Sequence, residues 1–185
     1  MVFGLFRKDP RRPVIAALHQ RIVAAARHPA LYASLQVPDT LEGRFEVLAL
    51  HVVLVLEALR RLDAPADEVG QELVDEVFRQ LEASLREMGV GDVVVPKRMK
   101  ALAQAFYGRA RAYDAALASG DETALAAALA RNVYAGATPG DALARYVLSA
   151  RRGLVGMTLE AMLREGPRFP APQDGPGAAV PEVSS

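Results

Sequence analysis

The sequence predicts an all-α protein: an irregular single-domain bundle of about seven helices with disordered termini. Apolar residues recur at helical spacing along most of the chain, and no two segments read as a pair of strands. The 185 residues are 51% hydrophobic, which is enough to build one core without cross-links. Cysteine is absent, so the sequence excludes structural disulfides and thiolate metal sites.

The composition divides the chain into three parts. We expect residues 1–10 to form a flexible N-terminal arm and residues 11–165 to form the helical domain. Residues 166–185 are rich in Pro, Gly, Ala and Ser and are predicted to be a disordered C-terminal tail.

The first three helices are predicted from their start signals. Pro13 suits the first turn of a helix that ends at Pro29, where a short second helix can restart. The third helix follows Asp39-Thr-Leu-Glu42, which resembles a capping box, and runs to residue 62. Its middle is apolar on nearly every face, so we expect it at the centre of the bundle.

The fourth and fifth helices flank an unusual loop. Helical periodicity predicts the fourth helix over residues 67–88. The glycines and valines of 89–95 favour a loop with a short extended piece, and Pro96 can open the fifth helix. Phe106 and Tyr113 lie on the apolar face of that helix, whereas Tyr107 points partly aside.

Two further helices complete the bundle. The sixth begins near residues 119–122 and ends near 133. Thr138-Pro-Gly-Asp141 is typical of a helix start with Thr138 as N-cap and Pro139 in the first turn. This last helix is predicted to run to about residue 164 and to bend near Gly153 or Gly156.

The composition and motifs indicate protein binding rather than catalysis. Lys+Arg and Asp+Glu both number 22, so no net charge favours nucleic acid. None of the three histidines belongs to a di-iron or HExxH motif, and there is no P-loop. We therefore predict neither enzymatic activity nor a bound metal or cofactor. The longest apolar run, 47–56, is about half of what a membrane-spanning helix needs. The N-terminus is briefly apolar and then basic, the opposite order to a secretory signal, so export is not expected.

Two alternatives to protein binding stay open. His51 lies in the most apolar helix, where it is either a hydrogen-bonded core residue or a haem ligand. The fifth helix carries Lys97, Lys100 and Arg111 and has no acid before Asp114, so it could bind RNA or the ribosome. Gly108 weakens the same helix and could permit close approach of another helix or a ligand.

Three segments of the chain resemble the ubiquinol–cytochrome c chaperone family. The first is Asp39-x-x-x-Gly43-Arg-Phe-Glu46 with Leu50-His51. The second is Leu85-Arg-Glu-x-Gly89-Val-Gly-Asp92, followed by Val95, Lys97, Met99 and Lys100. The third is Phe106-Tyr-Gly-Arg109 with Tyr113 and Arg131-Asn132. The order and spacing of the segments carry the resemblance, which covers roughly residues 10–165.

The resemblance implies an assembly chaperone that binds newly made cytochrome b and supports assembly of ubiquinol–cytochrome c reductase, the respiratory complex III. It implies no enzymatic activity. Bacterial relatives of this length are expected to act in the cytoplasm near the inner membrane. The ribosome and the inner-membrane surface are further partners to consider, and the oligomeric state stays open.

An apolar cleft with a polar rim is what a chaperone for a membrane protein needs. We expect the fourth and fifth helices and the loop between them to frame it, with Asp92 and Arg109 orienting polar ends of the client. Arg44 and Phe45 form a second candidate patch. The predicted partner-binding residues are Arg44, Phe45, Gly89, Gly91, Asp92, Val94, Lys97, Lys100, Phe106, Tyr107, Arg109 and Tyr113.

Overall fold

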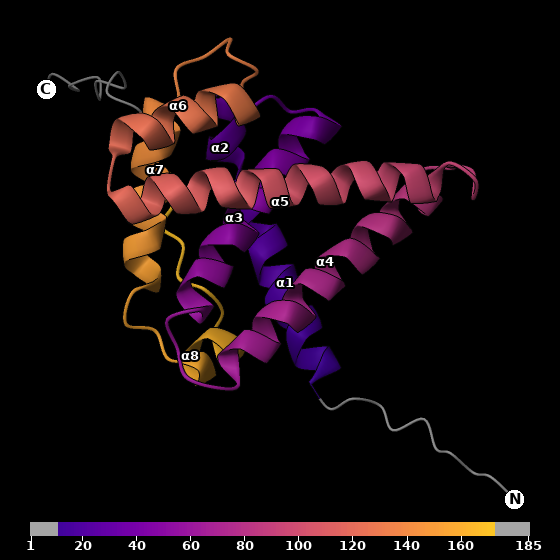
Figure 1. The fold of residues 1–185 in the computed structure, drawn as a ribbon, viewed down its shortest axis with the longest axis horizontal. Coiled ribbons are helices and arrows are strands. Elements are labelled where there is room, and N and C mark those ends of the chain that lie inside the picture. Colours follow the sequence, from indigo (N-terminus) through magenta and orange to yellow (C-terminus); the bar gives the residue numbers. More distant parts are fainter. Residues whose placement is uncertain (1–10, 173–185) are drawn as a thin grey trace, which may run out of the picture.

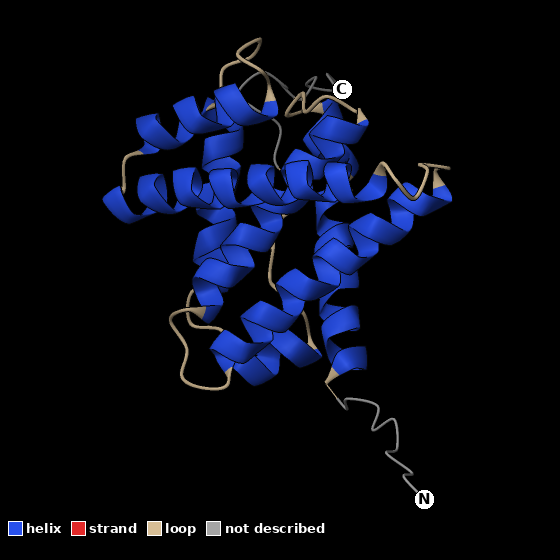
Figure 2. Cartoon of the chain, turned by 45° about the vertical axis from the view of Figure 1, so that its right-hand side comes forward, coloured by secondary structure: helices blue, strands red, loops and turns tan. Residues whose placement is uncertain are grey.

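The computed structural model describes residues 11–172, and all regular structure in this range is helical (Figures 1 and 2). This confirms the predicted fold class. The helices are α1 (Arg12–Ala26), α2 (Pro29–Ala33), α3 (Leu41–Leu59), α4 (Ala66–Glu87), α5 (Val95–Ser119), α6 (Glu122–Val133), α7 (Asp141–Leu154) and α8 (Leu159–Arg164). No helix of residues 11–172 is both long enough and apolar enough to cross a bilayer.

Helix α3 lies at the centre of the bundle, as its apolar composition predicts. It packs against α1, α4, α5, α6 and α7, and Leu50, Val52 and Leu54 on different faces are fully buried. The N-cap is Thr40, whose hydroxyl accepts a hydrogen bond of 3.1 Å from the Gly43 amide. The expected cap one residue earlier is therefore wrong, because Asp39 instead forms an ion pair with Arg44.

The C-terminal part differs from the prediction at both ends of the expected last helix. Gly140, not Thr138, is the N-cap of α7, and it makes no side-chain cap. A Cβ at Gly140 would lie 2.0 Å from the Ala126 carbonyl oxygen, so the close packing on α6 requires a glycine at this position. The predicted bend is a complete break. The chain turns through Gly156, which has a φ of +79°, and Thr158 then caps the separate helix α8.

The folded chain extends beyond the boundary predicted at residue 165. Phe169 packs against the core, and its ring meets that of His51 edge-on at 4.8 Å between centroids. The Arg168 carbonyl oxygen lies against Gly153, where a Cβ would be only 2.4 Å away. The predicted N-terminal arm and residues 173–185 lie outside the described part of the chain.

Helices α4 and α5 form a hairpin whose two arms meet at the loop of residues 88–94 and diverge away from it (Figure 1). The expected extended piece is wrong. The loop consists of turns, in which the amides of Val94 and Val95 both donate to the Gly91 carbonyl. Val95 is 1% exposed and anchors the first turn of α5, whereas Val93 is 92% exposed. The loop therefore joins the hairpin at its tip without plugging the core.

Candidate partner-binding groove

An apolar groove of about 360 Å³ opens between the start of α3, the end of α4 and the first half of α5. The predicted site, framed by the fourth and fifth helices, overlaps it. Apolar side chains line most of its surface, and Leu41 and Met88 are more than half exposed at its edge. The lining residues are Leu41, Glu42, Phe45, Glu46, Leu81, Ser84, Leu85, Met88, Arg98, Ala101, Leu102 and Ala105.

Helix geometry explains why these side chains meet. On α5, Arg98, Leu102 and Ala105 recur at three- and four-residue intervals, which places them on one face. That face is adjacent to the core stripe of Phe106 and Tyr113, so α5 has two apolar faces. One packs inward and the other lines the groove. A groove of this kind can take up a few apolar side chains of a partner.

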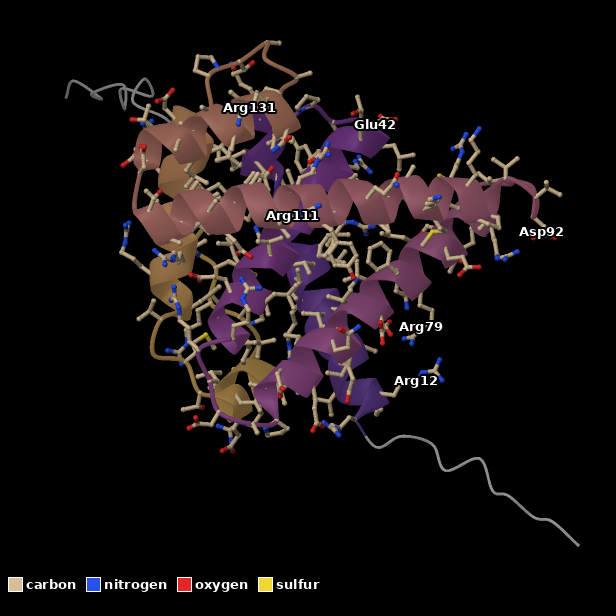
Figure 3. The ribbon with its side chains drawn as sticks, in the orientation of Figure 1. Arg12, Glu42, Arg79, Asp92, Arg111 and Arg131 are labelled. Atoms are coloured by element: carbon tan, nitrogen blue, oxygen red, sulfur yellow. The ribbon has the colours of Figure 1, made fainter. Side chains whose placement is uncertain are left out.

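Charged groups of both signs stand at the edge of the groove. Glu42 in the first turn of α3 and Arg98 on α5 are both exposed and line it, and the described residues offer neither of them an ion pair. Figure 3 shows Glu42 at the top, behind α5. The groove can therefore meet a partner whose apolar segment carries polar groups at its ends.

Arg109 closes the inner end of this region through a bidentate ion pair with Glu46. The Arg109 Nη2 donates to Glu46 Oε1 at 2.7 Å, and its Nε donates to Oε2 at 3.0 Å. Glu46 is 8% exposed and Arg109 is 28% exposed at their side chains. The hydrogen bonds to Glu46 raise the pKa of Arg109. Arg109 thus holds α5 to α3.

Phe106 and Tyr113 belong to the core, as their spacing predicts. Phe106 is 2% exposed and meets Phe78 edge-on at 5.6 Å between ring centroids. Tyr113 is completely buried, and burial, followed by the charge of Glu46, raises the pKa of its hydroxyl. Neither ring reaches the surface; Phe106 is next to the groove residue Ala105, whereas Tyr113 lies about two turns further along α5.

The structure separates Asp92 from Arg109. Asp92 is at the tip of the hairpin (Figure 3), with its side chain 85% exposed and paired with Arg86. Arg109 is 14 residues into α5 from Val95, which corresponds to about 21 Å along the helix. These two residues therefore do not share one site. Gly89, Gly91 and Val94 belong to the tip with Asp92.

The two residues of the second candidate patch, Arg44 and Phe45, lie in different surroundings. Phe45 is half-buried and lines the groove, whereas Arg44 pairs with Asp39 at 2.6 Å on an exposed surface. A charge at the start of an otherwise buried helix needs a partner, and both charges here have one: the exposed Arg44 pairs with Asp39, and the nearly buried Glu46 pairs with Arg109. Glu46 stands at the start of an apolar run, and Arg109 lies between the core positions Phe106 and Tyr113. That spacing was the signal for their ion pair.

The remaining predicted residues, Lys97, Lys100 and Tyr107, lie on the outward face of α5. The two lysines are exposed and make no salt bridge within the described chain. Tyr107 is 51% exposed, and its ring packs beside Phe78 at 6.4 Å between centroids. Next to it, Gly108 has open space where a Cβ would be, so no neighbouring helix requires a glycine there.

His51 is a core residue held by two hydrogen bonds. Its Nδ1 lies 2.8 Å from the Val47 carbonyl oxygen, and its Nε2 lies 2.7 Å from the Tyr146 hydroxyl on α7. A carbonyl oxygen can only accept, so Nδ1 carries the proton and Nε2 accepts from Tyr146. Burial lowers the pKa of His51 to about 4. Both ring nitrogens are engaged, so haem ligation would require breaking a contact between α3 and α7.

Sequence reasoning missed most of the groove. Leu81, Leu85 and Leu102 read as core residues because they continue helical stripes. Leu41, Met88 and Arg98 lie at helix ends, where the stripe no longer shows which face is covered. The clue in the sequence was that both apolar stripes run up to the loop, where little chain remains to cover them.

Comparison with known proteins supports a single family. The sequence profile named Ubiquinol-cytochrome C chaperone matches residues 33–169. The mouse protein named ubiquinol-cytochrome c reductase complex assembly factor 1 is 29% identical over 99 residues, which are 54% of this chain and 33% of the mouse protein. The chain thus spans about a third of the length of that relative. The crystal structure of the Cbp3 homolog from Brucella abortus is 42% identical, has a TM-score of 0.74 and covers 88% of this chain and 93% of its own.

The chain is a helical bundle with an exposed apolar groove between α3, α4 and α5. The profile match covers well over half of the sequence, and the Brucella structure has the same fold at substantial identity. The chain belongs to the ubiquinol–cytochrome c chaperone family, as its three motifs predict.

Proposed function

We propose that this chain is an assembly chaperone for ubiquinol–cytochrome c reductase that binds newly made cytochrome b in the groove between α3, α4 and α5. The observation that carries the proposal is a groove lined mainly by apolar side chains, some more than half exposed, in a member of this family. Apolar helices of a membrane protein that has not yet assembled need such a surface as protection from water.

The edge of the groove supports this partner chemistry. A transmembrane segment is apolar in its middle and polar at its ends. The apolar lining faces the first part, and Glu42 and Arg98 offer both signs of charge to the second. Binding would need no catalytic group, and we propose action at the cytoplasmic surface of the inner membrane, where the client is made.

The test is to place charge in the groove without disturbing the fold. Leu41→Glu and Met88→Glu change residues that are 55% and 52% exposed, and Val155→Glu is the matched control at 62% exposure outside this groove. In-cell crosslinking from position 102 would identify the captured protein, and assembled complex III would be measured in the same cells. We expect the double groove variant to lose about tenfold or more in capture of cytochrome b.

Three results would count against the proposal. One is unchanged capture and assembly in the double groove variant while its helix content stays normal. Another is an equal loss in Val155→Glu, which would show a general effect of added charge. The third is crosslinking to a protein other than cytochrome b, which would retain the groove as a binding site but reject the client.

A further inference from the structure

The outward face of α5 carries basic side chains that form no ion pair within the described part of the chain. Between Asp92 and Asp114 the sequence has no acid but five basic residues. Arg109 is taken up by Glu46, and Arg98 lines the groove. Helical periodicity of about 3.6 residues per turn places the other three, Lys97, Lys100 and Arg111, on one face.

This face is open to solvent along most of its length. Lys97, Lys100, Gln104, Tyr107 and Arg111 are all exposed. In Figures 1 and 3, α5 crosses the front of the molecule and Arg111 lies near its middle, with no helix in front of it. Arg111 has only a weak contact, 3.4 Å from its Nε to the Tyr107 carbonyl oxygen of its own helix. The three cations span about 21 Å along the axis.

Apolar side chains accompany the cations. At the hairpin tip, Val93 is 92% exposed and Val94 is 45% exposed, in turns immediately before α5. Further along the helix, Tyr107 exposes half of its surface. Lysines and arginines beside an exposed aliphatic tip and a tyrosine are the combination that binds an anionic bilayer surface.

We propose that the outward face of α5, with Val93 and Val94 at the hairpin tip, docks on an anionic membrane surface. The three cations lie against lipid phosphates, Tyr107 lies at the headgroup level, and the two valines enter the boundary of the acyl chains. The groove is on another face of α5, adjacent to the core stripe, so docking leaves it open. This inference does not depend on which protein the groove binds.

An RNA surface is the competing interpretation of the same cations. RNA contacts need positive charge and stacking rings, and Tyr107 could supply a ring. Two observations favour the membrane. The most exposed large apolar side chain among the described residues, Val93, lies four residues before Lys97 in the chain and has no use in a phosphate contact. Three cations are also few for a nucleic-acid surface that depends on phosphate neutralisation.

The experiment is vesicle flotation of the full chain with phosphatidylcholine vesicles, with and without phosphatidylglycerol. We expect binding only to the anionic vesicles and a decrease in high salt. Lys97→Gln with Lys100→Gln should lower the affinity about fivefold for each lysine removed. The matched control, Arg145→Gln with Arg152→Gln, removes two exposed cations of α7 and should leave binding unchanged.

A second pair of variants tests the valines. Val93→Asp should weaken vesicle binding about tenfold, and Val155→Asp, at another exposed valine, should not. Circular dichroism would check that each variant keeps its helices. Polyuridine RNA serves as the competing probe in a fluorescence-anisotropy titration.

Several outcomes would overturn the proposal. Flotation that is insensitive to Val93→Asp would remove the inserted tip. If deletion of residues 1–10 abolished vesicle binding and the lysine variant bound as well as wild type, binding would be assigned to the N-terminal segment instead. Polyuridine binding that depends on Lys97 and Lys100, together with no vesicle binding, would make the face a nucleic-acid surface.

Discussion

Glu46 and Arg109 form an ion pair that joins α3 to α5. Arg109 belongs to one of the three motifs that resemble the family and is expected to face a client, and its Nε and Nη2 both donate to Glu46. The carboxylate is nearly buried, whereas the guanidinium is more than a quarter exposed. The two partners are therefore unequal, because only the arginine can turn to water if the pair is broken.

We expect Arg109→Ala to lower the free energy of unfolding by about 3 kcal/mol, because it leaves a buried carboxylate without its partner. Glu46→Gln should cost less, since Arg109 can be hydrated. Urea unfolding followed by circular dichroism measures both, with the exposed Arg111→Ala as control. Equal costs for Arg109→Ala and Arg111→Ala would show that the ion pair does not stabilise the α3–α5 contact.

His51 makes the stability of the fold dependent on pH. The pKa of the folded-state imidazole is about 4, below the ordinary value of 6.5, because it is fully buried. Between these values the unfolded chain binds more protons than the folded chain, so stability falls as the pH falls. His19, whose pKa is lowered first by burial and then by the charges of Arg79 and Arg27, acts in the same direction.

The expected loss from His51 is up to about 3 kcal/mol between pH 6.5 and 4. It would be measured as the free energy of unfolding in urea at several pH values. His51→Gln should be less stable near neutral pH and show a flatter pH dependence. An identical slope in His51→Gln would mean that other groups cause the acid sensitivity.

At the scale of the helices, Gly108 and Gly43 form a natural pair. Both lie inside helices, but their surroundings are opposite. A Cβ at Gly108 meets nothing within 4 Å, whereas one at Gly43 would lie 2.0 Å from the Pro38 carbonyl oxygen. Gly108→Ala should therefore raise the free energy of unfolding by about 0.5–1 kcal/mol, and Gly43→Ala should lower it. Thermal unfolding of the two variants measures both changes in stability. Destabilisation by Gly108→Ala would contradict the open space around that position.

The same elements show how far sequence reasoning reaches. The helices follow from apolar spacing, because each must bury one stripe, and α3 is central because it is apolar on every side. Helix ends were less predictable. Gly140, the N-cap of α7, lies in close contact with Ala126 of α6, and the local sequence does not reveal this contact. The groove could not be predicted either, because it also depends on contacts between distant segments. A stripe of leucines has the same sequence pattern whether a neighbouring helix covers it or leaves it exposed.

Over the whole molecule, the helices differ in how many neighbouring helices pack against them. Helix α3 is surrounded by five others, whereas the outer half of the α4–α5 hairpin projects from the bundle and rests on little besides the start of α3 (Figure 1). Segments with fewer buried apolar contacts open locally at lower free energy. The groove lies at this less supported end, between the projecting arms and the first turns of α3.

Amide hydrogen exchange should reveal this gradient. We expect the amides of 47–56 in α3 to exchange near the rate set by global unfolding, and those of 84–100 to exchange through local opening, at least about tenfold faster. A client in the groove would then slow exchange in 41–46, 81–88 and 98–105, while α6 and α7 stay unchanged and serve as an internal control. Uniform exchange across the free chain would show that the hairpin is as rigid as the core. Protection spread over α6 and α7 would place the client elsewhere, so this measurement tests the groove independently of any substitution.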